Sequence, residues 1–446
     1  MAYLPNTEQD QQAMLREIGA ASIEELLESI PAELRLQRPL DLPQALGELE
    51  LTALLERLAA DNLSTQQAVC FLGAGAYDHF VPAVVDFVAS RSEFYTAYTP
   101  YQPEASQGTL QAMFEYQTLI TQLTALEVSN ASLYDGASAT AEAVLMALSA
   151  SPGRNQVLVA ESLHPEYRQV LGAYLANIDV EIQTVPTPNG VVELSSLGQL
   201  VSQSTACVVV QHPNFFGCLE DVQSAADVAH QAGALLVQVF DPISLGVLRP
   251  PGQLGTDIAV AEGQCLGNHL SYGGPYLGII ACREQFVRRM PGRLVGQTVD
   301  RRGRRCWVLT LQTREQHIRR EKATSNICTN QGLLALRAAV YLAVMGPHGL
   351  RSVAELCVQK AAYAIRRLAA DGNIALAFPR PTFKEFALRL RHTNIEKRLA
   401  EAQQEGILAG VPLGRWYPDR ADCLLVAVTE KRTKDQIDRL CALLTK

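Results

Sequence analysis

Asp241 stands where a charged side chain can meet a bound ligand. It follows the apolar run 235–240, which is typical of a buried strand. A carboxylate at the C-terminal end of a parallel strand lies in the crevice where open α/β sheets bind ligands. There it could pair with the ring nitrogen of pyridoxal phosphate (PLP), as an aspartate does in enzymes that use this cofactor. A turn residue ahead of Pro242 is the alternative.

A second candidate cofactor site is the segment 134–140, in which small residues and hydroxyls precede a helix predicted from Ala141. Backbone N–H groups near Gly136 and Ser138 would point outward at the helix N-terminus, where the helix dipole favours an anion such as a phosphate. The same pattern also fits an ordinary helix cap made by Ser138 or Asp135.

The amine that PLP chemistry requires is missing from this part of the chain. The segment 262–275, where a Schiff-base lysine would be expected, contains none. The lysines of the whole chain are Lys322, Lys360, Lys384, Lys397, Lys431, Lys434 and Lys446. No lysine amine ahead of residue 322 can therefore form an aldimine with the cofactor. The alternative is that the predicted fold is wrong and that no lysine is needed.

The segment 95–104 is rich in tyrosine and also carries an acidic residue. It contains Tyr95, Tyr98, Tyr101 and Glu104, and its two prolines exclude a regular helix. Tyrosine offers a flat apolar surface with a polar tip, which suits interfaces and ligand sites. An ordinary ordered loop is the alternative.

Ten arginines lie between residues 288 and 320, and the segment 313–326 is the densest in polar groups. Arginine binds carboxylates and phosphates through two parallel hydrogen bonds. Within this segment Arg314, Lys322 and Asn326 are candidates for a shared site. A solvated, salt-bridged face is the alternative for most of the arginines.

Three regions are predicted to position these residues. Residues 1–65 form a helical arm, with Asn6 or Thr7 as the first cap and a second helix that Pro31 ends. Residues 66–330 form a large α/β domain, and residues 331–446 form a smaller α+β domain.

In the large domain, apolar runs alternate with amphipathic stretches, which predicts a mainly parallel sheet with helices on both faces. Strands are expected at 156–160, 179–184, 207–211, 235–240, 257–261 and 277–281. The last two have no helix between them, which allows one antiparallel strand. The C-terminal domain is predicted to contain a helix at 331–344 and strands at 383–391 and 423–429.

Composition narrows the functional classes. The net charge of -8 argues against general nucleic-acid binding, which needs surplus Lys and Arg. The N-terminus lacks the features of a signal peptide, and apolar stretches such as 141–148 are too short to span a membrane. We therefore expect a cytoplasmic protein. The ten cysteines fit no metal-site spacing and are expected to be reduced core residues.

Several of these segments together resemble the P-protein of the glycine cleavage system, and within it subunit 1 of the two-subunit glycine dehydrogenase (decarboxylating). The matching stretches are 71–86, 95–108, 130–143, 239–246, 262–267, 271–278 and 313–331. They span the predicted large domain, and the last is long and specific.

The resemblance implies a PLP-dependent transferase fold of type I, like that of aspartate aminotransferase. It implies that glycine loses its carboxylate on PLP and that the aminomethyl group passes to the lipoyl arm of the H protein, with the T and L proteins as indirect partners. It places the Schiff-base lysine, and so the PLP, on subunit 2 as the partner, and Gln264 at the matching position here.

The resemblance also implies a division of labour, in which loops of this subunit complete the partner's active site. Tyr95, Tyr98, Tyr101 and Glu104 are the first candidates for that role, and Arg314, Lys322 and Asn326 are the second. Gly136, Ser138, Asp241 and Gln264 would then be vestiges of a cofactor site. Two alternatives remain: a catalytically silent scaffold that docks the H protein, and an independent PLP lyase that uses Lys322.

Overall fold

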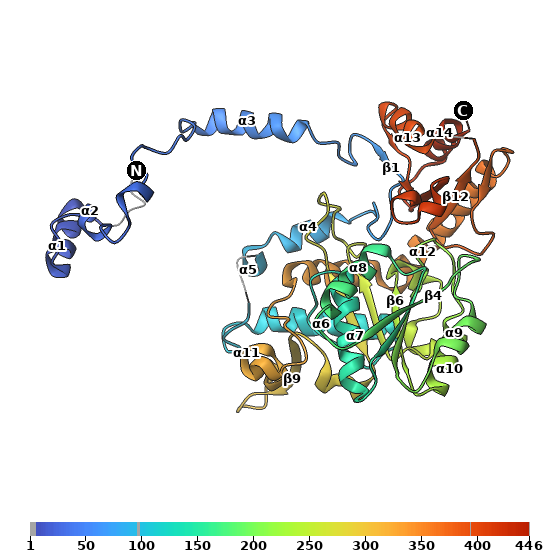
Figure 1. The fold of residues 1–446 in the computed structure, drawn as a ribbon, viewed down its shortest axis with the longest axis horizontal. Coiled ribbons are helices and arrows are strands. Elements are labelled where there is room, and N and C mark those ends of the chain that lie inside the picture. Colours follow the sequence, from blue (N-terminus) through green and yellow to red (C-terminus); the bar gives the residue numbers. More distant parts are fainter. Residues whose placement is uncertain (1–5, 96–98, 393, 446) are drawn as a thin grey trace. The chain divides into compact units, whose positions relative to one another are not determined.

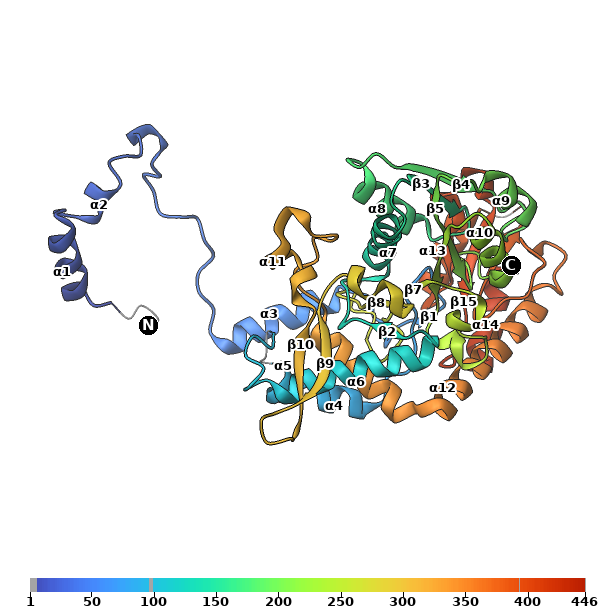
Figure 2. The ribbon, with the colours of Figure 1, turned by 90° about the horizontal axis from the view of Figure 1, so that it is seen from below.

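The computed structural model describes residues 6–95, 99–392 and 394–445. The chain forms two compact units, Met1–Leu63 and Ser64–Lys446, and each is described by itself. The ribbon views in Figures 1 and 2 show the elements of both units.

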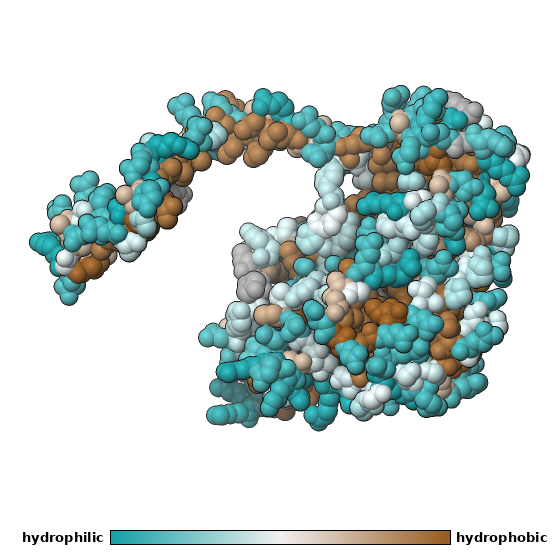
Figure 3. All heavy atoms as spheres, in the orientation of Figure 1, coloured by the Kyte–Doolittle hydropathy of each residue, from teal (hydrophilic) through white to brown (hydrophobic). Residues whose placement is uncertain are grey.

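The first unit is made of short helices joined by extended chain. Its elements are α1 (Glu8–Ile18), α2 (Ile23–Leu26), η1 (Ala32–Leu34) and α3 (Glu48–Ala60). Thr7, one of the two expected caps, caps α1 through a capping box with Asp10, and Ser22 caps α2, which ends earlier than predicted. None of the described residues in these helices is buried, and apolar side chains are visible along the unit in Figure 3.

The second unit is built on a seven-stranded sheet with the order β2-β8-β7-β6-β5-β3-β4. Its strands are β2 (Val128–Ser129), β3 (Gln156–Ala160), β4 (Glu181–Val185), β5 (Thr205–His212), β6 (Leu235–Phe240), β7 (Ile258–Glu262) and β8 (Gly278–Cys282). Strands β7, β6, β5, β3 and β4 pair in parallel, whereas β8 runs antiparallel to both of its neighbours. The predicted parallel sheet and its antiparallel strand are confirmed.

Helices cover both faces of this sheet, because its strands are apolar on both sides. Alternate residues of β3, β5 and β6 pack against α7 (Gly136–Ala150) and α8 (Pro165–Leu175). The other face packs against α9 (Leu194–Leu200), α10 (Val222–Gln231), α6 (Gln107–Thr124) and α12 (Gly332–Leu368). The sheet is thus the middle layer of three.

Helix α12 runs far beyond the predicted 331–344 and has 37 residues. It is interrupted at Gly346, whose backbone is non-helical (φ 58°, ψ −175°) and which precedes Pro347. By length and composition alone α12 could cross a membrane. Its buried side chains, however, pack in the core with those of α6 and of β7 and β8. We read it as a core helix.

A second, four-stranded antiparallel sheet has the order β11-β12-β15-β14. Its strands are β11 (Ile374–Leu376), β12 (Glu385–Leu390), β14 (Val411–Pro412) and β15 (Cys423–Ala427), and it packs against α13 (Ile395–Gln404) and α14 (Lys434–Leu444). Strands β12 and β15 confirm the predicted pair. Strand β1 (Val69–Cys70) pairs in parallel with β13 (Ile407–Leu408), which joins the start of this unit to its C-terminal part.

The remaining elements include short helices and a hairpin that was not predicted. The helices are α4 (Ala83–Ala89), α5 (Ser92–Tyr95) and α11 (Gln316–Arg319), and the hairpin is β9 (Leu294–Val299) with β10 (Arg305–Thr310). This hairpin contains part of the arginine-rich segment.

Candidate functional site

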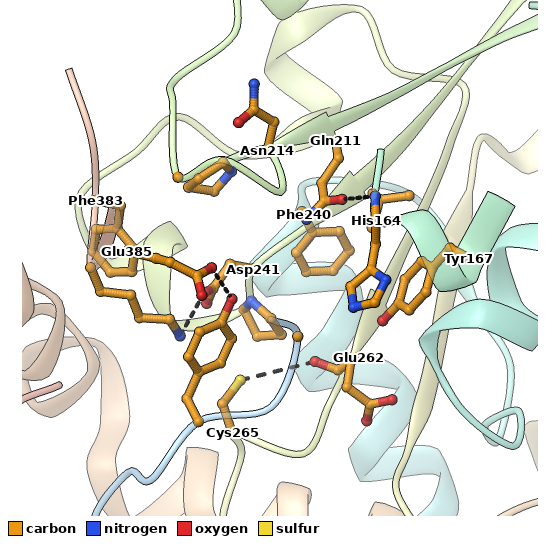
Figure 4. Close-up of a pocket in the computed structure, with 17 residues that line it drawn as sticks. His164, Tyr167, Gln211, Asn214, Phe240, Asp241, Glu262, Cys265, Phe383 and Glu385 are labelled. Atoms are coloured by element: carbon orange, nitrogen blue, oxygen red, sulfur yellow. Dashed lines mark hydrogen bonds and ion pairs between the residues drawn. The ribbon is translucent and has the colours of Figure 1, made fainter. Parts of the chain in front are cut away.

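The crevice expected at the carboxyl ends of the parallel strands is present. Residues at the ends of β5, β6 and β7 line it, together with the loop before α4 and the start of β12. Figure 4 shows Asp241, Glu262 and His164 around it, with Glu385 entering from the smaller sheet. The enclosed cavity measures only about 40 Å³.

Asp241 is paired with a lysine from the smaller sheet. The Lys384 ammonium lies 2.6 Å from Asp241 Oδ2, and the side chains of Lys384 and Asp241 are 2% and 13% exposed. Asp241 Oδ1 accepts the N–H of Ile243 at 2.9 Å, so the carboxylate also stabilises the turn after β6. The carboxylate that was expected to hold a cofactor nitrogen therefore already has a cation beside it.

Lys384 makes further contacts with the loop before α4. Its ammonium lies 3.0 Å from His79 Nε2 and 3.6 Å from the centre of the Tyr77 ring. His79 Nδ1 lies 2.6 Å from Glu430 Oε2. Glu430, His79 and Cys357 converge within 4.8 Å, but the adjacent Lys384 ammonium disfavours a metal ion there.

The protonation states of Lys384, His79 and Glu430 follow from burial and charge. Burial lowers the pKa of Lys384, but Asp241 together with the nearby thiols of Cys265 and Cys357 outweighs burial, so the pKa is raised and the ammonium stays charged. Burial and the Lys384 charge lower the pKa of His79, which leaves it neutral. Burial opposes ionisation of Glu430, but the His79 ring and backbone N–H groups together outweigh burial and lower the pKa of Glu430 to about 2. With these protonation states, Lys384 donates to His79 Nε2, and His79 Nδ1 donates to the Glu430 carboxylate.

The N-terminus of α7 also has an occupant. Glu262, at the end of β7, accepts the N–H of Gly136 through Oε2 at 2.9 Å. Glu262 Oε1 accepts the N–H groups of Gln264 and Leu277, both at 3.0 Å. Asp135 is the N-cap and accepts the N–H of Ser138 at 2.7 Å. The helix begins at Gly136, earlier than predicted, and its first N–H groups are hydrogen bonded.

Gln264 is 2% exposed and lies in the chain between Glu262 and Cys265, which line the crevice. Its side-chain oxygen accepts the N–H of Tyr77 at 2.9 Å, and its amide nitrogen donates to the Asn268 carbonyl at 2.8 Å. An amide can make both bonds, whereas an ammonium could make only the second. The side chain at this position thus ties the loop before α4 to the large sheet.

The sequence matches the family described as glycine cleavage system P-protein over residues 1–444. This chain belongs to that family. Proteins named probable glycine dehydrogenase (decarboxylating) subunit 1, from Desulforamulus reducens and Moorella thermoacetica, are each 52% identical to it. The matches cover 99% of this chain and 99% and 98% of those relatives.

Solved structures agree with the family and with the fold. A glycine decarboxylase (P-protein) of the glycine cleavage system, in inhibitor-bound form, is 48% identical, has a TM-score of 0.91, and covers 100% of this chain and 99% of its own. A sphingosine-1-phosphate lyase from Burkholderia pseudomallei is 16% identical, has a TM-score of 0.68, and covers 93% of this chain and 94% of its own. The fold is that of type I PLP-dependent enzymes, as the resemblance implied. The name subunit 1 implies a second subunit in this P-protein family.

PLP does not fit the crevice of this P-protein chain in its present arrangement. The cavity of about 40 Å³ is far below the roughly 300 Å³ or more of small-molecule pockets. Lys384 has taken the position beside Asp241 where the ring nitrogen would lie, and Glu262 has taken the Gly136 N–H where a phosphate oxygen would bind. A methyl group added at Gly136 would collide with the Tyr167 hydroxyl, so the approach to α7 is also closed.

The tyrosine segment lies away from this crevice. Tyr95, at the end of α5, is 57% exposed, and Tyr101 is 74% exposed. Glu104 is also exposed. Tyr98 lies outside the described residues. None of the three described residues lines the crevice, so their proposed role concerns a surface of this P-protein chain.

The residues of the second candidate group lie on short segments around α11. Lys322 and Asn326 are exposed, and Arg314 is half-buried. Arg314 Nη1 donates to the Met290 carbonyl, while its Nε and Nη2 have no partner among the described residues. Lys322 does not line the crevice, so the independent lyase reading finds no support in its position.

The sequence interpretation missed two of the residues that decide the character of this site, Lys384 and Glu262. Lys384 was recognised as a lysine, but it was assigned to the C-terminal domain. No sequence pattern around Lys384 or Asp241 indicates that the two residues meet. Glu262 had a signal, because it follows an apolar strand just as Asp241 does.

Proposed function

We propose that this chain is the subunit of a heteromeric glycine dehydrogenase (decarboxylating) that lacks the Schiff-base lysine. In this reading, PLP is held covalently by subunit 2, glycine is decarboxylated there, and the aminomethyl group passes to the lipoyl arm of the H protein. The relatives named subunit 1 support the assignment.

One observation carries the proposal: the crevice that would hold PLP is filled by the chain's own charged groups. Lys384 lies beside Asp241, and a buried amide, Gln264, stands at the position where the resemblance places the Schiff-base lysine. A chain with the fold of a PLP enzyme and no room for the cofactor must act with another chain if it takes part in the reaction.

The contribution of this chain is assigned to residues that can reach the partner. In type I PLP-dependent enzymes, as the resemblance implies, active sites lie near the subunit interface. The exposure of Tyr101 and Glu104 supports such a reach, because these side chains are not committed to the core. Arg314, with two unpartnered guanidinium nitrogens, is the second candidate for an anionic group.

The test identifies the lysine to which PLP is covalently attached. The chain is incubated with PLP alone and together with subunit 2, reduced with borohydride, and mapped by mass spectrometry for pyridoxyl-lysine. We expect the adduct on subunit 2 only. A stoichiometric adduct on Lys322 or Lys384 of this chain would overturn the proposal, whereas low labelling spread over exposed lysines would not count as a site.

A silent scaffold that only docks the H protein is the competing function. It also predicts polar residues at an interface, so cofactor mapping does not distinguish it from a shared active site. Turnover of variants in the tyrosine segment does, because a scaffold tolerates them as long as the complex assembles.

A further inference from the structure

The Lys384–Asp241 ion pair joins two parts of the fold that come from different sheets. Asp241 follows β6 of the seven-stranded sheet, and Lys384 precedes β12 of the four-stranded sheet. The 2.6 Å contact is almost fully shielded from solvent, so its attraction is weakened little by water or salt.

Further contacts connect the same parts through the loop before α4. Glu385 Oε1 accepts the N–H of Ala74 at 2.7 Å, and Glu385 Oε2 accepts the Tyr77 hydroxyl at 2.8 Å. The N–H of Tyr77 in turn donates to Gln264 on the large-sheet side at 2.9 Å. The loop is therefore held from both sides, with Lys384 over the Tyr77 ring at its centre.

The crevice between the two sheets is narrow. Its cavity of about 40 Å³ has room for little more than a water molecule. Other contacts also join the two sheets, since the N–H of Leu219 donates to the Pro381 carbonyl and the rings of Phe216 and Phe378 pack together. Within the crevice, the Lys384–Asp241 ion pair links the two sheets directly.

We propose that the Lys384–Asp241 pair is an internal clamp that holds the four-stranded sheet against the seven-stranded sheet and keeps this crevice shut. The clamp rests on geometry alone and does not depend on the proposed function.

Cys265 provides a reporter of crevice opening. It lines the crevice and is 3% exposed. Cys207 lies in the core of β5, is 0% exposed, and does not line the crevice, so it reports global unfolding. Cys328 is exposed and reports the activity of the reagent. Alkylation of each thiol by N-ethylmaleimide is followed by peptide mass spectrometry under native conditions, with the full chain.

The test variant is Lys384→Met, which keeps the length of the side chain and removes its charge. Alkylation of Cys265 is expected to accelerate at least ~30-fold, as loss of a buried ion pair implies, while Cys207 stays unreactive. Lys384 favours the Cys265 thiolate, so removing its charge would by itself slow alkylation, and acceleration can only come from access. Lys434→Met is the matched control, because its pair with Asp438 is exposed.

Two further variants keep the test decisive if Lys384→Met folds poorly. Asp241→Asn breaks the same pair from the other side, and Asp241→Asn with Lys384→Met leaves neither charge unpaired. Because the Asp241 charge raises the pKa of Cys265, its loss by itself speeds alkylation. In these two variants opening is therefore also measured by amide hydrogen exchange of the loop before α4, which should accelerate while exchange of β5 stays unchanged. The proposal fails if Cys265 reacts at the wild-type rate in a folded variant. It also fails if Cys265 and Cys207 accelerate together, since the pair would then support overall stability and not closure.

Discussion

Glu262 accepts the N–H of Gly136 at 2.9 Å, at the first turn of α7. A side chain from the end of β7 thus occupies the helix N-terminus that the sequence suggested as an anion site. Because the carboxyl group is buried, its protonation depends on the fold around it.

The pH dependence of stability should report Glu262. Burial raises the pKa of Glu262 to about 8, from the 4.5 of an ordinary glutamate carboxyl group. The folded state therefore holds this proton more tightly than the unfolded state, and the contribution to stability present below pH 4.5 is lost as pH rises towards 8. In Glu262→Gln, which cannot titrate, the fall in unfolding free energy between pH 5 and 8 should be smaller than in the wild type.

Urea unfolding at pH 5, 6.5 and 8 measures this difference. At pH 5 the variant should be less stable by about 1–3 kcal/mol, because the amide cannot accept all three N–H groups. The deficit should shrink at pH 8. The exposed Glu56→Gln is the control. A deficit that grows with pH would contradict the assignment.

Restoring the lysine at its expected position should not restore cofactor binding. In Gln264→Lys the new amine would still face a crevice in which Lys384 pairs with Asp241 and Glu262 occupies Gly136. We expect no aldimine absorbance after addition of PLP and no adduct at residue 264 after borohydride reduction. Appearance of a stoichiometric aldimine in this single variant would show that the crevice is open to the cofactor.

Variants in the tyrosine segment should separate a shared active site from a scaffold. We expect glycine decarboxylation by the assembled complex to fall in Tyr101→Phe, Glu104→Gln and Tyr98→Ala. The loss should be ~100-fold for each side chain that positions the substrate in the shared active site. The exchange of labelled carbon dioxide into glycine measures the activity, and gel filtration checks the complex. Full activity in all three variants, with the complex intact, would favour the scaffold. Asp419→Asn, an exposed change at a distant loop, is the control.

Removing residues 1–63 should leave the stability of the second unit nearly unchanged. The second unit is compact by itself, and the described helices of the first unit contain no buried residue. We expect the unfolding free energy of residues 64–446 to change by less than ~1 kcal/mol in chemical denaturation. A large loss would show that the arm is part of the folded core.

The parallel strands could be predicted from sequence because strands buried on both faces are apolar throughout, as in 207–211 and 235–240. The cap of the first helix could also be predicted, since Thr7 accepts the N–H of Asp10, three positions along the chain. The hairpin of β9 and β10 was missed because its burial is partial and its polar residues follow no clear alternation.

The character of the crevice could not be predicted in the same way. The approach of Lys384 to Asp241 depends on how the two sheets pack, and no local pattern encodes a contact between such distant positions. The sequence shows that no lysine lies near Gln264. It does not show that Lys384, from the smaller sheet, pairs with Asp241 in this crevice. Considering the lysines of the C-terminal domain would have raised the question of whether one of them enters the crevice. It could not have shown that the Lys384 ammonium lies beside Asp241.

The pairing of β1 with β13 bears on how this chain is made. The strand Val69–Cys70 leaves the ribosome more than 300 residues ahead of its partner Ile407–Leu408. At roughly 5–20 residues per second, the first strand waits on the order of tens of seconds for its partner. Strand β1 stays unpaired throughout that time, so the second unit can complete its fold only after Leu408 has been made.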